Sequence, residues 1–182
     1  MNVLAMDIGG STRNGFCLMD TKTKEIIKCS YITYDKKLTK LDHRKRILQE
    51  VQDYYYNYDI DAIVFERVNL FKGGRISPLA NIMSLCKVQC TIIDNMSDLV
   101  NIYDVPVKSW KVISLNNGNA KKEDSISLVQ TKYPDVDLNI PKKRKDAKPE
   151  LNHDLADAIC IAVAVSLQPK KIIKKENLVN YK

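Results

Sequence analysis

The stretch NVLAMDIGGSTRNGFCLMD, residues 2–20, carries the strongest indication of how the chain folds. Residues 2–6 are a compact apolar run that ends at Asp7, and the following Gly9-Gly10-Ser11-Thr12 segment has the composition of a turn. Residues 15–19 have the pattern of a second strand, and residues 25–34 alternate as a third. Short links between three successive strands predict an antiparallel meander.

The period of the apolar residues changes after this meander, and helices then alternate with strands. The remaining predicted elements are a helix over 41–58, a strand over 61–65, a helix over 78–96, a strand over 101–105, a short helix through Trp110, a helix over 120–133 and a buried helix over 153–167. Helical connections make the first, fourth and fifth strands parallel. This order predicts an α/β fold with a mixed five-stranded sheet flanked by helices, which suits the RNase H-like architecture.

Polar residues precede three of the predicted helices and are expected to cap them, namely Ser77, Asn119 and Asn152. Pro78 is expected in the first turn of its helix. The charged, proline-bearing segment 134–150 is expected to be a mobile loop. We therefore divide the chain into one domain over 1–168 and a basic, poorly ordered tail over 169–182.

The chain has 182 residues, 45% of them hydrophobic and 28% charged, which suits one globular domain. No apolar run is long enough to span a bilayer, and the start lacks the pattern of a signal peptide. We therefore expect a cytoplasmic protein with no membrane partner. The five cysteines form no C-x-x-C pair and are best explained by core packing in a reducing compartment.

The formal net charge is +7, which favours an acidic partner such as nucleic acid. The basic residues gather in three blocks, over 40–46, 142–145 and 170–175. If these blocks neutralise phosphates, binding to nucleic acid will depend steeply on salt concentration.

Four carboxylates occupy positions that this topology brings together. Asp7 and Glu66 each end a strand that is predicted to be parallel, and the carboxyl ends of parallel neighbours meet at one edge of a sheet. Asp154 and Asp157 are three residues apart near the start of the last helix and share one of its faces. A buried, apolar helix tolerates two carboxylates badly unless a cation neutralises them.

These four residues offer only oxygen donors, and no cluster of histidines or cysteines accompanies them. Such a set favours a hard cation, Mg²⁺ or Mn²⁺. Two such ions about 4 Å apart can activate a water and stabilise the leaving oxygen of a phosphodiester. We therefore predict hydrolysis of a DNA strand that leaves a 5′-phosphate and a 3′-hydroxyl.

Each of these acids also has a purely structural explanation. Asp7 before two glycines can start a turn, and Glu66 can pair with Arg67 or Arg75 at a strand end. Acids in the first turn of a helix interact favourably with its dipole whatever the function. Taken singly, none of the four identifies a site, whereas their joint arrangement is much harder to produce by chance.

The chain resembles the RuvC-type Holliday junction resolvases of the RNase H-like superfamily over roughly residues 1–167. The matching motifs are AMDIGGS with Asp7, IVFERV with Glu66, VKSWK followed by NNGNAKKED, and HDLADAICIA with Asp154 and Asp157. The last motif and the G-x-A-x-K piece are fairly specific, whereas the D-x-G piece is not. The lysine- and asparagine-rich composition is compatible with a divergent phage member of that family.

The resemblance implies roles for particular residues. Its metal ligands would be Asp7, Glu66, Asp154 and Asp157, holding two Mg²⁺ ions for which Mn²⁺ substitutes. Lys108 and Lys122 would contact or polarise the DNA backbone, and Lys111 and Lys121 belong to the same basic segment. The helix over 78–96 would form a homodimer whose opposed sites cut a four-way junction symmetrically. No helicase partner is indicated.

The chain departs from the family's pattern after the fourth strand. The family has an aromatic wedge residue three positions beyond the strand's glutamate, where this chain has Asn69, with Phe71 two positions further. Phe71 is expected to take over the wedge role unless that role is lost, and Arg75 nearby to contact the nucleic acid. Trp110 either stacks on a base or packs the short helix, and His153 either supports the acidic site or lies at the surface.

Other functions are compatible with parts of this sequence. One is a different RNase H-like nuclease that acts on RNA, and another is a catalytically silent protein that binds branched DNA. The intact acidic set argues against the silent protein. A sugar-kinase or actin-like ATPase has a similar D-x-G-G-S-T turn, but that fold needs two such domains and 182 residues hold one.

Overall fold

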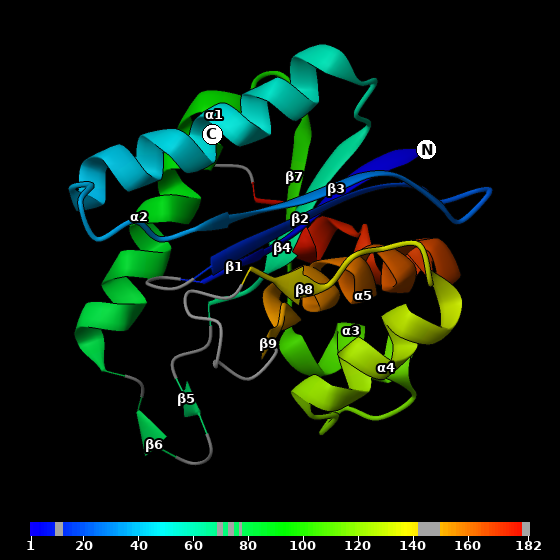
Figure 1. Cartoon of the computed structure of the whole chain (residues 1–182). Coiled ribbons are helices and arrows are strands. Elements are labelled where there is room, and N and C mark those ends of the chain that lie inside the picture. The colour runs from blue at the N-terminus through cyan, green and yellow to red at the C-terminus, as the bar shows by residue number, and fades with distance from the viewer. Residues whose placement is uncertain (10–12, 69–70, 73–74, 77, 142–149, 180–182) are drawn as a thin grey trace.

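The structure is a computed structural model that describes residues 1–9, 13–68, 71–72, 75–76, 78–141 and 150–179. Its centre is a five-stranded sheet in the order β3-β2-β1-β4-β7 (Figure 1). The strands are β1 (Asn2–Ile8), β2 (Arg13–Asp20), β3 (Glu25–Thr33), β4 (Ala62–Glu66) and β7 (Asn101–Val105). The first three form the antiparallel meander, and β4 and β7 run parallel to β1. The predicted α/β fold and its mixed sheet are thus confirmed.

Helices cover both faces of this sheet (Figure 1). The helices are α1 (Lys40–Asn57), α2 (Leu79–Met96), α3 (Val107–Leu115), α4 (Lys122–Lys132) and α5 (His153–Leu167). Leu4 and Met6 of β1 belong to the core beneath α1 and α2, whereas Val3 and Ala5 belong to the core beneath α5. This alternation follows from the two-residue period of a strand and assigns each β1 side chain to one face.

The last long helix is the most deeply buried element. Residues 158–165 of α5 are all buried, because the sequence there is apolar all round and the helix packs against the sheet on one side and α3 and α4 on the other. The Asn152 side chain caps it by accepting a hydrogen bond from the backbone N–H of Leu155 (3.0 Å). This cap and the buried helix were both predicted.

The structure corrects the prediction between β7 and α5. Helix α3 continues well past Trp110 and ends at Asn116, which adopts the left-handed conformation (φ 55°). Helix α4 starts later than predicted, so Asn119 is not its N-cap. The backbone N–H of Lys121 instead donates to the Asp124 carboxylate (2.7 Å), so an acid inside the first turn does the work of a cap.

Short strands modify two of the predicted loops. Segment 134–150 is not wholly a loop, because β8 (Asn139–Ile140) pairs with β9 (Glu150–Leu151) directly before α5. After β4, a hairpin forms from β5 (Phe71–Lys72) and β6 (Arg75–Ile76). Pro78 stands at the N-cap position of α2, one residue earlier than predicted. Ser77 and the basic block 142–145 lie outside the described residues.

The segment after α5 is ordered through residue 179, so the prediction of a poorly ordered tail is wrong for this part. It contains α6 (Pro169–Ile172) and a short 3₁₀ helix, η1 (Lys175–Asn177). Ile172 and Asn177 are buried, and the backbone N–H of Val179 donates to the Ile102 carbonyl of β7 (2.8 Å). No helix in the described part of the chain is long and apolar enough to cross a membrane.

Candidate active site

Asp7 and Glu66 lie on neighbouring parallel strands at the same edge of the sheet. Met6 of β1 pairs with Phe65 of β4, so the next residues of the two strands, Asp7 and Glu66, follow in the same register. Side chains alternate along each strand, and Asp7 shares its parity with Val3 and Ala5, which face α5. Both carboxylates are therefore on the face that α5 covers.

The first turn of α5 lies against the same edge of the sheet. Gly15 of β2 is the register partner of Asp7, and a Cβ atom at Gly15 would overlap the carbonyl oxygen of Asp154 and lie 2.7 Å from the Cα of Leu155. The helix backbone therefore rests directly on this glycine. The contact brings the start of α5, and with it Asp154 and Asp157, next to the end of β1.

The electrostatics of Asp7 show that the four predicted acids share one environment. Burial raises the pKa of the Asp7 carboxyl well above its usual range. The negative charges of Glu66, Asp157 and Asp154 raise this pKa further, in that order, and Lys122 lowers it. The structure thus brings together acids from β1, β4 and α5.

The two aspartates of α5 have the same character. Burial raises the pKa of Asp157, and Asp154 adds to this effect, while the nearby Ser125 hydroxyl, Lys111 and Lys122 oppose it. Burial also raises the pKa of Asp154, against Lys122, His153 and Arg13. Among the described residues, the buried Oδ1 atom of Asp157 has no hydrogen-bond partner. Such an oxygen is costly to bury unless a donor or a cation satisfies it.

Trp110 contacts this site from within the hydrophobic core. Its side chain is completely buried, and its indole N–H donates a hydrogen bond to Oε2 of Glu66 (3.0 Å). Of the two interpretations of Trp110, packing is therefore correct, and base stacking is excluded by the burial. The contact with Glu66 could not be predicted from the sequence, because the two residues lie on different elements.

The predicted basic residues differ in whether they interact with the acids. Lys122 starts α4 and acts electrostatically on three of the four acids. The Lys111 ammonium donates to the Ala120 carbonyl (2.7 Å) and lies 5.4 Å from the centre of the Trp110 ring. Lys108 and Lys121 are exposed on the surface of the same region. Among the predicted basic residues whose side chains are described, Lys122 and Lys111 are the two that act on the acids.

Two residues that the sequence did not single out also support this region. Gly15 is required by the close approach of α5, and Arg13 forms an ion pair with Glu150 of β9 (2.9 Å). That pair joins the start of β2 to the strand that precedes α5. The side chains of Phe71 and Arg75, which were predicted to contact DNA, lie outside the described part of the structure, although their backbones form the β5–β6 hairpin.

The acids offer the donor atoms that a hard cation prefers, but their carboxylates are not grouped closely enough to form a complete ligand shell. In the described residues, no three His, Cys, Asp or Glu side chains are grouped tightly enough to hold a metal ion as they stand. The donors are nevertheless all carboxylate oxygens, one of them buried without a partner among the described residues, and three of them raise the pKa of Asp7. A bound cation would remove this repulsion, and the carboxylates must draw closer to bind it.

Solved structures of other proteins share this fold. Over 93% of the chain, the structure superimposes on Thermus thermophilus RuvC (TM-score 0.64, 16% identity, 96% of that chain) and on T. thermophilus RuvC in complex with Holliday junction substrate (0.65, 15%, 95%). It also matches the yeast mitochondrial Holliday junction resolvase Ydc2 (0.56, 13%, 93% of this chain and 81% of that one). No protein-family model and no curated protein sequence matches the chain.

The sheet order, the helical layers and these superpositions define an RNase H-like α/β fold. Within that class, the chain has a RuvC-type fold, as the sequence motifs predicted. At 13–16% identity this similarity defines the architecture, and the assignment of an activity depends on the acidic cluster.

Proposed function

We propose that this chain is a divalent-metal-dependent endonuclease that resolves Holliday junctions and other branched DNA in recombination or repair. The proposal is supported by the RuvC-type fold, and it depends above all on one observation about the site. The pKa of Asp7 is raised by burial and by the charges of Glu66, Asp157 and Asp154, so acids from β4 and α5 act on the carboxylate that ends β1. Repulsion of this kind is typical of a cation site rather than of structural acids.

Asp7, Glu66, Asp154 and Asp157 are the proposed ligands of Mg²⁺, with Mn²⁺ as a substitute and two ions per site. When bound, the ions supply an activated water and charge stabilisation for the leaving oxygen. The water oxygen bonds to phosphorus while the bond to the 3′ oxygen breaks, which leaves a 5′-phosphate and a 3′-hydroxyl. The chain's own acids fix where this phosphate must lie.

The basic residues around the acids are proposed to hold the DNA backbone. Lys122, which already offsets the charge of the acids, is the one expected to contact the reacting phosphate. Lys108, Lys111 and Lys121 of α3 and the α3–α4 connection are proposed to bind neighbouring phosphates, which requires Lys111 to leave the Ala120 carbonyl. Phe71 is proposed as the wedge residue and Arg75 as a further contact.

A homodimer through α2 completes the proposal, because cutting two strands of a junction needs two sites. Leu79 and Met83 on the first turns of α2 are 70% and 47% exposed, and Cys90 further along the helix is exposed as well. Large apolar side chains exposed along one stripe are typical of an interface.

We therefore expect a dimer mass in sedimentation at micromolar concentration, and a shift towards monomer for Met83→Lys. Asn95→Lys, which introduces the same charge at an exposed position of α2 on a different face from this stripe, serves as the control. A wild-type monomer would contradict the dimer.

The decisive experiment is a nicking assay on four-way junction, fork, duplex and single-stranded DNA and on structured RNA, with Mg²⁺ and with chelator. We expect metal-dependent cutting of the branched DNA. Asp7→Asn should abolish cutting while junction binding survives, because the basic surface provides the affinity. Exclusive cutting of RNA would identify another RNase H-like nuclease. Binding of junctions without cutting would identify a silent DNA-binding protein, and cutting by Asp7→Asn would refute the proposed site.

A further inference from the structure

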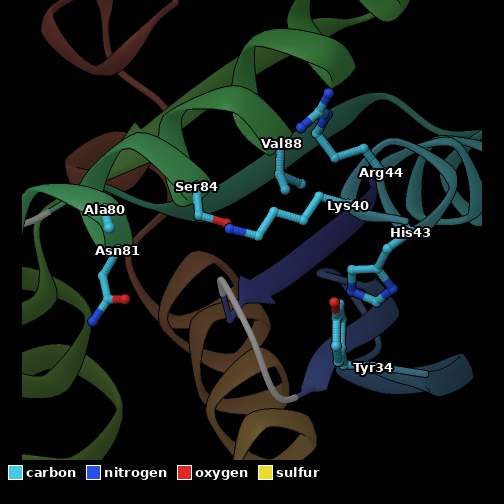
Figure 2. Close-up of a pocket in the computed structure, with 8 residues that line it drawn as sticks. All are labelled: Tyr34, Lys40, His43, Arg44, Ala80, Asn81, Ser84 and Val88. Atoms are coloured by element: carbon cyan, nitrogen blue, oxygen red, sulfur yellow. The ribbon is translucent and has the colours of Figure 1, made fainter. Parts of the chain in front are cut away.

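A cavity lined by both apolar and polar groups lies on the other side of the sheet from the acids, between the N-terminal ends of α1 and α2 (Figure 2). Its volume is about 170 Å³. The residues that line it come from the end of the meander and from both helices, and they are Tyr34, Lys40, His43, Arg44, Ala80, Asn81, Ser84 and Val88. This set includes two cations, two hydroxyls, an amide and an imidazole, and it contains no carboxylate.

Several groups contribute positive charge to this cavity. Lys40 and Arg44 stand on the first turns of α1, and the Lys40 side chain reaches across the cavity towards Ser84 of α2 (Figure 2). The first backbone N–H groups of a helix are not used within the helix, and they give its N-terminus a partial positive charge. Among the residues that the structure describes, no side chain caps α2 by a hydrogen bond. The Thr39 side chain caps α1 by accepting from the Asp42 N–H (3.1 Å), so the positive charge of the cavity comes mainly from Lys40, Arg44 and the start of α2.

His43 is the observation that identifies a ligand. It lines the cavity at only 3% exposure, and its Nε2 atom lies 3.4 Å from the Nδ2 atom of Asn14, which is itself completely buried. With the Asn14 amide placed so that its Nδ2 atom donates to Nε2, the neutral imidazole carries its hydrogen on Nδ1. Among the described residues, Nδ1 has no hydrogen-bond partner. A buried donor without an acceptor is costly, and an anion would satisfy it.

We propose that this cavity binds a phosphate group. A phosphate oxygen would accept from Nδ1 of His43, while Lys40 and Arg44 neutralise its charge and Ser84 and Asn81 offer further polar contacts. Phosphate suits the site better than a carboxylate, because it presents several acceptor oxygens to donors that converge from two helices.

The position of the cavity favours a phosphate of the DNA backbone over a free one. Asn14, which contacts His43, precedes Gly15 in β2, and their register partners on β1 are Ile8 and Asp7. The cavity and the acidic cluster thus lie at the same edge of the sheet, on opposite faces. DNA that crosses this edge can reach both. The assignment of this phosphate to the DNA backbone rests on the proposed function, whereas the proposal that the cavity binds phosphate does not.

The first arm of the test uses inorganic phosphate and the metal-free protein. The chain has two histidines, and we expect phosphate to shift the imidazole NMR signals of His43 while those of His153 stay in place, with His153→Gln used for assignment. Phosphate should also raise the melting temperature above that in chloride of equal ionic strength. Lys40→Gln/Arg44→Gln should lose both responses, and Lys37→Gln/Lys45→Gln, which removes two exposed charges outside the cavity, should keep them.

The second arm measures junction affinity in chelator over a series of salt concentrations. We expect the cavity variant to bind about tenfold more weakly and to lose about one unit of the salt slope, as for one phosphate contact. The surface variant should lose clearly less affinity. Phosphate binding without an effect on junction affinity would keep the site and assign it to a free phosphate compound. No response to phosphate and equal junction affinities for the two variants would overturn the proposal. Failure of the wild-type chain to bind junctions would reject the proposed function and leave the phosphate arm intact.

Discussion

The Asp7 carboxyl occupies a position that disfavours its own charge in the metal-free protein. Burial and three neighbouring acids raise its pKa, so the folded chain holds a proton there that the unfolded chain releases at lower pH. The folded state therefore has its full stability from this group at low pH and loses it as pH rises through the raised pKa. Above the raised pKa, a charged Asp7 weakens the fold until a cation binds.

We predict that Asp7→Asn is more stable than the wild type in chelator at pH 8, by about 1 kcal/mol or more, since each pKa unit corresponds to about 1.4 kcal/mol. The difference should shrink towards pH 4 and on addition of Mg²⁺ to the wild type. Urea denaturation at several pH values measures it, with Asp53→Asn on the exposed side of α1 as the control. Equal stabilities at all pH values would show that Asp7 does not repel its neighbours.

Trp110 offers a direct readout of the site, because it is the only tryptophan in the chain and its indole donates to Glu66. A cation bound by Glu66 would place positive charge beside this indole. We predict that Mn²⁺ changes the tryptophan emission in a saturable manner, and that Glu66→Gln and Asp7→Asn require much more metal. Emission that stays constant over the metal concentrations that support cutting would argue against Glu66 as a ligand.

The acidic residues could be predicted from the sequence because their positions follow from local patterns. The apolar run before Asp7 and the strand before Glu66 are visible in the sequence, and topology then brings their ends together. The partners of these acids could not be predicted. Trp110 and Gly15 act through contacts between elements, and no periodicity in the sequence carries that information.

At the level of elements, the contact between β2 and α5 controls the geometry of the site. Gly15 leaves room for the helix backbone at Asp154, and any side chain there must push the first turn of α5 away from the sheet. That displacement would move two proposed ligands away from the other two.

We predict that Gly15→Ala lowers the free energy of unfolding by about 3 kcal/mol or more, at the upper end of overpacking effects, and abolishes cutting. Gly118→Ala is the matched control, because its new methyl group would meet the exposed Val112 side chain at 3.1 Å and Lys108 at ordinary contact distance (3.8 Å), and it should cost less than about 1 kcal/mol. Urea denaturation and the nicking assay measure both variants. A Gly15→Ala protein with normal stability would show that α5 can move freely.

The strands and long helices were predicted almost completely, since a two-residue or helical period over many residues is a local signal. The errors fall where distant contacts decide. Helix α4 begins at Lys122 because Asp124 satisfies the preceding N–H, although Asn119 has the better local propensity for a cap. The pairing of β8 with β9 likewise joins residues that are separated by a charged segment without periodicity.

At the level of the molecule as a whole, the C-terminal segment, residues 168–179, lies against β7 at one edge of the sheet. Leu178 bridges Tyr103 of β7, and Asn177 donates to the Ile172 carbonyl (2.8 Å) while accepting from Arg67 (3.3 Å). The lysines of this segment gave it the composition of a disordered tail. The few apolar residues between them, above all the buried Ile172, determine how it packs.

We predict that truncation after Gln168 lowers the free energy of unfolding by about 2 kcal/mol or more, mainly through the loss of buried Ile172. Lys170→Gln/Lys171→Gln, which removes charge from exposed positions, should leave stability unchanged and weaken DNA binding at most slightly. Thermal and urea denaturation distinguish the two. Unchanged stability of the truncated chain would mean that the segment merely rests on β7.

The alternation of β1 has a consequence for how this protein can change in evolution. Every second side chain from Val3 points towards α5, and Asp7 faces α5 because it lies an even number of residues after Val3. Deleting or inserting one codon before residue 7 would preserve an apolar strand yet turn this carboxylate to the wrong side of the sheet. Lineages of this protein should therefore tolerate length variation in the Asp20–Glu25 turn and almost none within the first seven codons.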